Sequence, residues 1–246
     1  MRFGTFVFPV SQKPGNDHRI IHETLEEVQL CDKLGFDTAW LSEHHFDGAT
    51  AYVDPVVFAA SIASTTRKIR IGFAVVEMAL HHPVRLAAQT ALLDNLSNGR
   101  ILVGTGKGSA FNEYEYIGFG VPMEEAAESL QEAEDLILEA WKGKPVNFKG
   151  KYWDVAFPEL RPTPYQTPHP PLVRACLSED STREMARLHR PILIGAQDND
   201  SISKRINLYR QELESSQLSE EGIVSLLDKI WVSKNCLLYT SPSPRD

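Results

Sequence analysis

The sequence predicts an α/β fold of the (β/α)8 barrel class, and three observations lead to that prediction. Short apolar runs alternate with longer amphipathic ones along the 246 residues, and repeated strand–helix units with short loops require parallel pairing with right-handed crossovers. A chain of this length is typical of one such barrel. The first apolar run, residues 2–8, is not followed by a Gly-x-Gly-x-x-Gly turn, which disfavours the open dinucleotide-binding sheet.

The expected elements follow from apolar periodicity and from residues that begin and end helices. Asp54 before Pro55 is suited to start a helix, and Gly35 and Gly99 are suited to end one. The sequence predicts strands at residues 2–8, 36–41, 69–76, 101–103, 172–177, 192–195 and 230–232. It predicts helices at residues 19–34, from 54–55 onward, 82–98, 123–141, 181–189 and 201–214.

Two segments depart from this alternation. Residues 142–171 are rich in proline, and within them residues 146–155 are expected to form a small hairpin that turns at Lys149-Gly150. The Pro/Ser-rich tail at 236–246 matches neither a helix nor an eighth strand; it is either a non-native terminus or an ordinary flexible end. We therefore expect one barrel domain over residues 1–235 with an insertion at 142–171, incomplete at strand eight because the chain is C-terminally truncated.

Composition narrows the function classes. The 33 acidic and 25 basic residues leave a formal charge of -8, which argues against binding to nucleic acid through its phosphates. The three cysteines, Cys31, Cys176 and Cys236, cannot all pair and match no zinc spacing, so a reducing cytoplasm is the expected location. No signal peptide and no membrane span are recognised.

The strongest candidate catalytic cluster is Glu43-His44-His45-Phe46-Asp47, directly after the second expected strand. Active sites of barrels are built from the loops at the C-terminal ends of the strands. Histidine is suited to acid–base work there because its ordinary pKa is about 6.5. A second pair, His81-His82, follows the third strand at the same end. The alternative is that these loop histidines only make hydrogen bonds.

A metal-dependent hydrolase is an alternative function for the same loops. Adjacent histidines in an extended loop point apart, and the sequence contains no His-x-His pair and no His-Glu-x-x-His helix. The imidazole and carboxylate groups that are suited to zinc or iron belong to His44, His45, His81, His82, Glu43, Asp47 and His169.

Two loops are candidates for binding an anion. The turn Gly104-Thr105-Gly106-Lys107-Gly108-Ser109 combines glycines with a positive charge and a hydroxyl, although it fits neither the Rossmann nor the P-loop pattern. The segment Ser178–Thr182 supplies hydroxyls at the start of a helix. The alternatives are a tight turn with a solvated lysine and simple helix capping. Together the two loops suggest one ligand that carries a phosphate.

On these residues the chain resembles the bacterial luciferase-like family of flavin-dependent monooxygenases. The resemblance extends over residues 1–232 and rests on motifs in a fixed order. The motifs are Gly35–Trp40 leading into Glu43–Phe46, then His82–Arg85, Leu93–Arg100 and the Gly104-x-Gly-x-Gly turn.

The resemblance implies a barrel that binds reduced flavin mononucleotide (FMN), or in one branch the deazaflavin F420. It implies acid–base work for His44, with His45 and His82 lining the flavin mouth. Ala74-Val75 matches a non-proline cis peptide bond beneath the flavin ring. The residues matched to phosphate binding are Gly106, Lys107 and Gly108 in one loop and Ser178, Ser181 and Thr182 in the other.

The chain also departs from the family pattern. Lysine stands at 107 in place of a phosphate-binding arginine and is a less selective phosphate ligand. Residues 122–141 contain no arginine, and Gly106 stands where the light-emitting enzymes carry a cysteine. These departures argue against a true luciferase. A fragment that binds flavin without turnover, or is inert, is a further alternative.

The resemblance implies a separate flavin reductase as partner, a small apolar substrate such as an aldehyde, a ketone or a hydrocarbon-like molecule, and a homodimer. F420-dependent hydride transfer is the alternative reaction of the same fold. The homodimer would pack the second and third helices, on which small side chains allow close approach. These side chains belong to Ala59, Ala60, Ala63, Ala87 and Ala88. The alternative is that they face the barrel itself.

Overall fold

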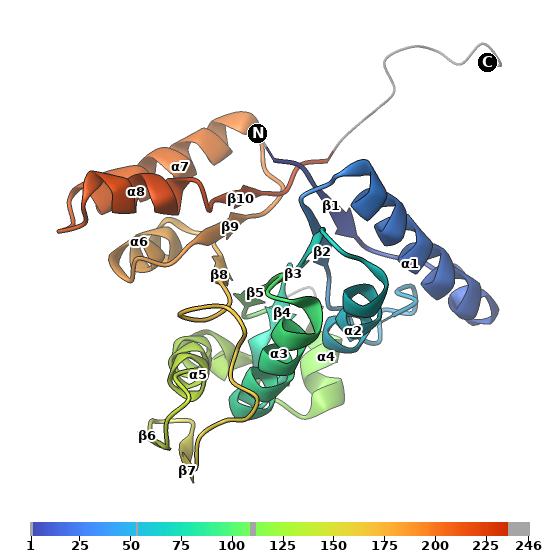
Figure 1. The fold of residues 1–246 in the computed structure, drawn as a ribbon, viewed down its shortest axis with the longest axis horizontal. Helices are drawn as coiled ribbons and strands as arrows, with labels where there is room; N and C mark the ends of the chain where they lie inside the picture. Colours follow the sequence, from blue (N-terminus) through green and yellow to red (C-terminus); the bar gives the residue numbers. More distant parts are fainter. Residues whose placement is uncertain (1, 53, 109–111, 236–246) are drawn as a thin grey trace. The chain divides into compact units, whose positions relative to one another are not determined.

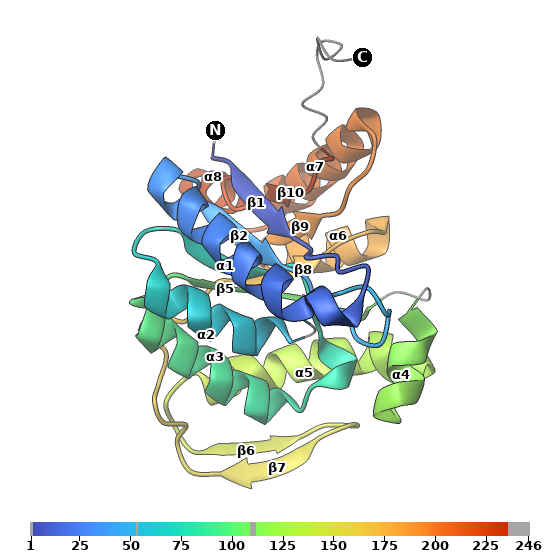
Figure 2. The same cartoon turned by 90° about the vertical axis from the view of Figure 1, so that its right-hand side faces the viewer.

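The computed structural model describes residues 2–52, 54–108 and 112–235. The chain divides into two compact units, Met1–Val173 and Arg174–Asp246, and each is described by itself (Figures 1 and 2). The expectation of one domain over residues 1–235 stays a prediction. The tail at 236–246, with the expected truncation, lies outside the described residues.

The first unit contains a parallel sheet, a small hairpin and five α-helices. Its strands are β1 Gly4–Val7, β2 Thr38–Leu41, β3 Arg70–Phe73, β4 Val76–Glu77 and β5 Ile101–Gly106, with the hairpin β6 Val146–Lys149 and β7 Asp154–Phe157. Its helices are α1 Asp17–Leu34, α2 Pro55–Thr65, α3 Pro83–Ser97, α4 Glu113–Phe119 and α5 Ala126–Ala140.

The strands of the first unit pair in the order β1-β2-β3-β5, all parallel, and β4 pairs with β5. Helices α1, α2, α3 and α5 pack side by side in that order, as Figure 2 shows. Buried aliphatic side chains from the strands and these helices form one continuous core. Strand–helix–strand units with short loops produce this parallel arrangement, as the apolar alternation predicts.

The Trp40 ring on β2 packs over glycines of the neighbouring strands β1 and β3. A Cβ atom placed on Gly72 of β3 would lie 2.4 Å from the Trp40 ring, and one on Gly4 of β1 would lie 3.2 Å from it. Glycines on the neighbouring strands therefore make room for this one large side chain. Phe6 and Phe8 on β1 and beyond it remain 51% and 40% exposed, so an aromatic surface follows β1 towards its C-terminal end.

The second unit continues the strand–helix alternation. Strand β8, Leu172–Ala175, begins in the first unit and ends in the second, where it pairs in parallel with β9, Ile192–Ile194, and β9 pairs with β10, Trp231–Val232. The helices are α6 Glu179–Arg187, α7 Asn199–Glu214 and α8 Glu220–Leu227. A separate apolar cluster holds this unit together.

The boundaries predicted from the sequence are confirmed at most elements. Asp54 accepts hydrogen bonds from the N–H groups of Val56 and Val57 at the start of α2, and Gly35 ends α1 with φ +82°. The hairpin at 146–157 is confirmed. Two helices, α4 and α8, were missed, because α4 is a seven-residue segment of aromatic and acidic residues with weak helical periodicity, and α8 is short.

Two strand predictions are corrected. The expected strand at 69–76 is two strands, β3 and β4, because a cis peptide bond between Ala74 and Val75 interrupts the extended backbone. The expected strand at 101–103 continues through Gly106, because β4 pairs with its second half at Thr105 and Gly106.

The small residues proposed for a dimer interface are mostly part of the chain's own core. Ala59, Ala63 and Ala87 are buried, and Ala60 and Ala88 pack against the same core. These side chains face the chain's own packing partners because α2 and α3 lie against each other. The alternative that these side chains face the chain's own core is therefore confirmed for the three buried alanines, and the homodimer stays a prediction.

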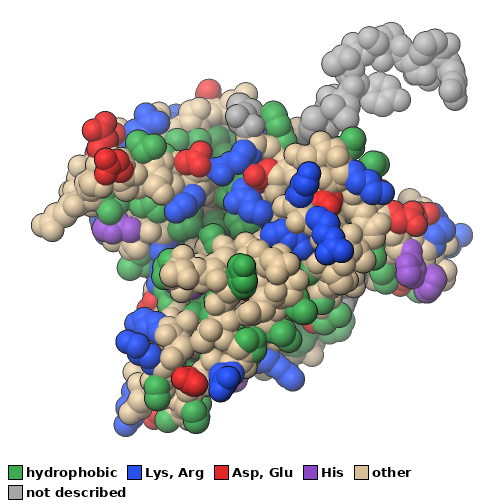
Figure 3. Space-filling view, in the orientation of Figure 1, with side chains coloured by type: hydrophobic (Ala, Val, Ile, Leu, Met, Phe, Trp, Pro, Cys, Tyr) green, Lys and Arg blue, Asp and Glu red, His purple; other side chains and the backbone are tan. Residues whose placement is uncertain are grey.

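Among the described residues, no helix has the length and apolar character needed to cross a membrane. Figure 3 shows Lys and Arg side chains lying among Asp and Glu side chains on one face of the molecule. The expected lack of nucleic-acid binding stays a prediction.

Asp32 at the end of α1 fixes the start of β3. Its carboxylate accepts hydrogen bonds from the backbone N–H groups of Arg67 at 3.0 Å, Lys68 at 2.8 Å and Ile69 at 2.6 Å. Burial raises the pKa of Asp32, but the three N–H donors outweigh it and lower the pKa below its ordinary value. The ionised form is therefore the one that the fold stabilises.

We expect Asp32→Ala to destabilise the protein by about 1–3 kcal/mol, because three backbone donors lose a charged acceptor. The stabilisation by Asp32 is present above the ordinary pKa of an aspartate, about 3.9, and is lost as the pH falls through the lowered pKa in the folded protein. Urea unfolding at pH 7 measures the effect. Glu26→Gln, an exposed change on the same helix, is the control, and equal midpoints for the two variants would contradict the prediction.

Candidate active site

The candidate site lies in the first unit, at the C-terminal ends of the parallel strands. The loop after β2 carries Glu43, His44 and His45, the residues after β4 carry His81, and the segment after β5 leads into α4. This is the end of the sheet at which the sequence predicts the catalytic loops, as in barrels generally.

Glu43 is the centre of the first cluster. Its side chain is almost fully buried, and its Oε1 lies 2.8 Å from Nε2 of His45 and 2.7 Å from Nε2 of His81. Its Oε2 accepts the backbone N–H of Glu77 at 2.8 Å. One carboxylate thus joins the loop after β2, strand β4 and the segment before α3.

The electrostatics of this cluster favour the ionised form of Glu43 and the protonated form of His81. Burial raises the pKa of Glu43, but hydrogen bonds from His45, His81 and the Glu77 N–H together lower it below its ordinary value. Burial lowers the pKa of His81, but the Glu43 carboxylate overcomes that effect and raises it. Glu43 is therefore an ionised anchor for two imidazoles rather than a group that exchanges protons.

His44 is the histidine of this loop that reaches solvent, with 30% of its side chain exposed. Its Nδ1 lies 3.1 Å from Nδ2 of Asn112 and 3.6 Å from Oε1 of Glu115. Its ring meets the ring of Phe8 edge to face, with the centroids 5.1 Å apart. Because the Asn112 amide donates to Nδ1, the neutral ring carries its proton on Nε2.

His45 plays a different part from His44. Its ring is buried, held by Glu43 and packed edge to face against Phe119 with the centroids 4.8 Å apart. Its backbone N–H donates to Oε1 of Glu115 at 2.6 Å. His45 therefore fixes the position of the loop, which supports the interpretation of a loop histidine that makes hydrogen bonds.

Two further buried carboxyl groups, Glu77 and Glu115, lie beside His44. Glu77 is 3% exposed and Glu115 is fully buried. Among the described residues, Oε2 of each has no hydrogen-bond partner. Burial, with the nearby Glu115 and Glu43 charges, raises the pKa of Glu77 to about 9, against a smaller opposite effect of the Asn112 amide.

The glycines at the C-terminal end of β5 and directly after it have a packing role that the sequence did not suggest. Gly104 and Gly106 are part of β5, so the expected turn at 104–109 is wrong for residues 104–106, and anion binding there stays a prediction. A Cβ atom on Gly106 would lie 2.8 Å from Cγ2 of Val75. One on Gly108, where φ is +82°, would lie 2.6 Å from the Tyr116 hydroxyl and 2.7 Å from Oε2 of Glu77.

Lys107 lies exposed at the end of β5, and its carbonyl accepts a hydrogen bond from the Tyr116 hydroxyl. Ser109 lies outside the described residues. The predicted cis peptide bond between Ala74 and Val75 is confirmed, and Val75 contacts Gly106 at the same end of the sheet. Phosphate binding by Lys107 and a flavin position over Ala74-Val75 stay predictions.

The second candidate anion loop lies in the second unit. Ser178 caps α6 by accepting the N–H of Ser181 at 3.2 Å, and Oγ of Ser181 accepts the N–H of Ser178 at 3.3 Å. The buried Thr182 donates its hydroxyl to the Ser178 carbonyl at 2.8 Å. Helix capping thus explains all three hydroxyls, and phosphate binding at Ser178, Ser181 and Thr182 stays a prediction.

The residues suggested as metal ligands are largely engaged elsewhere. Asp47 accepts the N–H groups of Ala49 and Thr50, and His169 stacks on Trp141. His82 is exposed and precedes α3 without capping it. Among the described residues, one group brings metal-ligand atoms together, all within 4.8 Å of one another. Its members are His44, Glu77 and Glu115.

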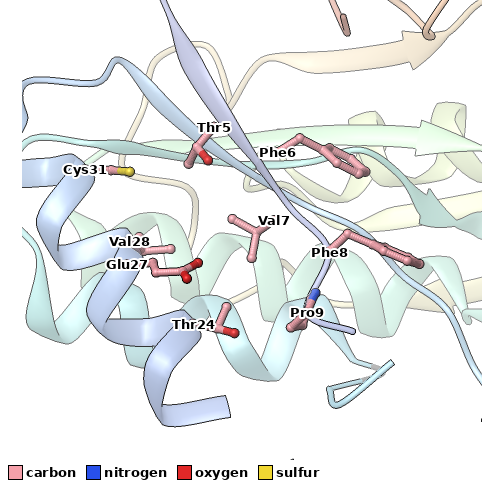
Figure 4. A pocket seen from close by; sticks show the side chains of 9 residues that line it. All are labelled: Thr5, Phe6, Val7, Phe8, Pro9, Thr24, Glu27, Val28 and Cys31. Carbon is pink, nitrogen blue, oxygen red and sulfur yellow. The ribbon is translucent and has the colours of Figure 1, made fainter. Parts of the chain in front are cut away.

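A cavity of about 140 Å³ lies between β1 and α1. Residues 5–9 of the β1 segment line one side of it, and four residues of α1 line the other (Figure 4). The rings of Phe6 and Phe8 point away from α1 in this view. The cavity is therefore separate from the loops that carry the histidines, although Phe8 contributes to both.

Sequence reasoning missed Glu77, Asn112, Glu115 and Tyr116. Glu77 interrupts an apolar run at residues 73–80, and a lone acidic residue in a buried strand is a signal that it has a specific environment. Asn112 and Glu115 belong to the missed helix α4 or its start, so no periodicity marked the side chains that face inward.

Comparison with known proteins assigns the family. A family model described as luciferase-like monooxygenase matches residues 1–226. The chain belongs to this family. The membership confirms the resemblance seen in the sequence and, with the parallel strands and outer helices, the barrel class of the fold.

Curated members of the luciferase-like monooxygenase family include two similar proteins. Limonene 1,2-monooxygenase of Rhodococcus erythropolis is 33% identical over 163 residues, which are 66% of this chain and 42% of the relative. The oxygenase component of flavin-dependent trigonelline monooxygenase of Acinetobacter baylyi is 32% identical over 174 residues, 70% of this chain and 48% of the relative. The chain spans about half the length of the curated relatives that it matches.

Solved structures agree with this assignment. Monooxygenase RslO1 of Streptomyces bottropensis superposes with a TM-score of 0.82 at 27% identity, covering 89% of this chain and 68% of that one. An F420-dependent secondary alcohol dehydrogenase superposes with a TM-score of 0.73 at 20% identity, covering 95% of this chain and 68% of that one. The second likeness shows the shared fold alone.

We expect Glu43→Gln to lower the pKa of His81, because burial then acts on the imidazole without an opposing carboxylate charge. The raised pKa of His81 means that the stabilisation by the pair is full below about pH 6.5 and is lost as the pH rises through the raised value. Loss of the charge should cost about 3 kcal/mol or more at pH 6. NMR titration of the histidine ring protons measures the change, with exposed His18 and His22 as internal controls; an unchanged His81 pKa would contradict it.

We expect Gly108→Ala to be more destabilising than Gly120→Ala, although both positions have positive φ, +82° and +67°. A Cβ atom at Gly120 meets nothing within 4 Å, whereas one at Gly108 meets Tyr116 and Glu77. Both variants carry a backbone cost of about 1–2 kcal/mol, and Gly108→Ala adds about 1–3 kcal/mol of steric strain. Thermal unfolding of the two variants compares them, and equal losses would show that the contact is unimportant.

Proposed function

We propose that this protein is the oxygenase part of a flavin-dependent monooxygenase that uses reduced FMN and dioxygen on a small apolar substrate. Family membership supports the reaction class, and the name of the trigonelline relative includes both a flavin and an oxygenase component. The observation that carries the proposal is His44, a partly exposed imidazole held by Asn112 at the C-terminal end of the sheet beside an exposed aromatic surface.

The residues of the first unit fit a flat aromatic ligand. Phe6 and Phe8 are stacked with their centroids 6.5 Å apart and are partly exposed. The Phe8 ring also contacts the His44 ring edge to face. Gly106 lies beside Val75 of the cis peptide Ala74-Val75, and both lie at the C-terminal end of the sheet. We propose that flavin binds over this surface of the first unit, with Lys107 as a phosphate ligand.

When bound, reduced flavin supplies the chemistry that activates dioxygen. The protein's part is to position a proton and to exclude water. The Asn112 amide holds Nδ1 of His44 as an acceptor, so the proton that His44 exchanges is the one on Nε2. Glu43 stays ionised and fixes His45 and His81, which keeps the loop rigid while His44 acts. The exposed aromatic surface favours an apolar substrate, because such a substrate removes apolar area from water.

A separate reductase that delivers reduced FMN, a homodimer and a reducing cytoplasmic location are parts of this proposal. F420-dependent hydride transfer is the competing reaction of the same fold. A metal-dependent hydrolase is disfavoured, because His45 and His81 both bind the Glu43 carboxylate instead of converging on an open site.

We expect His44→Ala to slow product formation by about 10²–10⁴-fold, the usual contribution of a positioned acid–base group, while FMN affinity changes little. The assay supplies reduced FMN from a separate reductase and ¹⁸O₂, offers a panel of small aldehydes, ketones and terpenes, and counts labelled product by mass spectrometry. FMN affinity is measured by fluorescence quenching.

His18→Ala, an exposed histidine on α1, is the matched control and should keep full activity. Equal turnover of His44→Ala and the parent protein would remove His44 from the mechanism. Binding of reduced F420 without binding of FMN would replace the monooxygenase by hydride transfer, and FMN binding without labelled product from any substrate class would favour a non-catalytic protein.

A further inference from the structure

We propose that His44, Glu77 and Glu115 form a binding site for one divalent transition-metal ion, with Zn²⁺ as the ion that fits their chemistry best. The inference rests on the placement of these three side chains and does not require the proposed monooxygenase activity. Each residue offers one ligand atom, an imidazole nitrogen or a carboxylate oxygen, and these atoms lie within 4.8 Å of one another.

The first support is that one oxygen of each of the two buried carboxyl groups lacks a hydrogen-bond partner, although Oε1 of Glu115 accepts the His45 N–H and Oε1 of Glu77 accepts the Asn112 amide. Glu77 and Glu115 are 3% and 0% exposed, and Oε2 of each is buried without a hydrogen-bond partner among the described residues. In the same part of the chain no lysine or arginine pairs with either group. Buried polar atoms are stabilised by a hydrogen bond, a paired charge or a coordinated metal, and one metal ion bound here would supply a partner to these two oxygens.

The second support is the third ligand and its access to solvent. Nδ1 of His44 faces Oε1 of Glu115 at 3.6 Å, and two ligands of a tetrahedral zinc ion with bonds of about 2.0–2.1 Å stand roughly 3.3 Å apart. The side chain of His44 is 30% exposed, so an ion can enter from solvent. Small side-chain movements are enough to bring the ligands to bonding distance.

The ligand set also selects among cations. One imidazole with two carboxylates is suited to zinc and its first-row neighbours, whereas magnesium prefers oxygen ligands and retained water. Three protein ligands leave the fourth tetrahedral position open. Asn112 is the residue that competes, because its amide now donates to both His44 and Glu77, at 3.1 and 3.3 Å.

A consequence for activity follows if the proposed function is correct. A metal ion on Nδ1 of His44 takes that nitrogen from Asn112 and fixes the imidazole, so Zn²⁺ should inhibit product formation. This consequence is secondary, because the binding itself is measured without flavin, reductase or substrate.

The test is a titration of the flavin-free protein with Zn²⁺ in competition with a chromophoric chelator. The parent for all variants is His18→Ala/His22→Ala, because His18 and His22 lie one helical turn apart with their rings 4.6 Å apart and form a possible surface site. We expect this parent to bind one Zn²⁺ at micromolar concentrations or below. His44→Gln, Glu77→Gln and Glu115→Gln should each weaken binding by at least about tenfold, since even outer-shell changes cost that much.

Glu113→Gln is the matched control, because Glu113 is exposed on the same short helix as Glu115 and should bind Zn²⁺ like the parent. Asn112→Asp should tighten binding, because it replaces a competing donor by a third carboxylate, which supplies a fourth ligand. Circular dichroism confirms that each variant is folded, and His44→Gln, at a partly exposed position, remains informative if a buried variant unfolds. No Zn²⁺ binding by the parent, or equal effects of Glu113→Gln and Glu115→Gln, would overturn the inference.

Discussion

The arrangement of the candidate site depends on one buried carboxylate, that of Glu43. It accepts hydrogen bonds from the imidazoles of His45 and His81 and from the backbone N–H of Glu77, which belong to three segments of the chain. A buried anion with this many donors stays ionised, and removal of any donor leaves part of its charge unpaired. Glu43 therefore fixes the relative positions of the loop after β2, strand β4 and the segment before α3. Because His44 is the next residue after Glu43, this constraint also fixes the position of His44.

The neighbouring histidines divide two tasks between them. His45 is buried and His81 half-buried, and both rings bind the Glu43 carboxylate, whereas His44 is partly exposed and touches Phe8, Asn112 and Glu115. A reactive group needs supports that do not themselves react. The separation of a rigid ionic anchor from an exposed imidazole is the structural reason for proposing proton transfer at His44.

The same part of the sheet contains an unfavourable interaction between two buried carboxyl groups. Glu77 and Glu115 are buried close together, and the raised pKa of Glu77 reports the cost of charging both. Gly108 lacks a side chain where one would displace Glu77 and Tyr116, so the backbone makes room for this acidic pair instead of filling the space with apolar atoms. Such an arrangement costs stability, and it is the kind of cost that functional sites commonly carry.

The sequence by itself determined the alternation of strands and helices, the helix ends at Asp54 and Gly35, and the position of the histidines after a strand. These features depend on local periodicity, on capping and on chain order, which a sequence contains directly. Only the tertiary structure decided that Glu43 binds His45 and His81, and that Asn112 and Glu115 reach His44. Asn112 is 68 residues from His44, and which side chains meet across such a separation is set by how the strands and helices pack, because no local pattern encodes it.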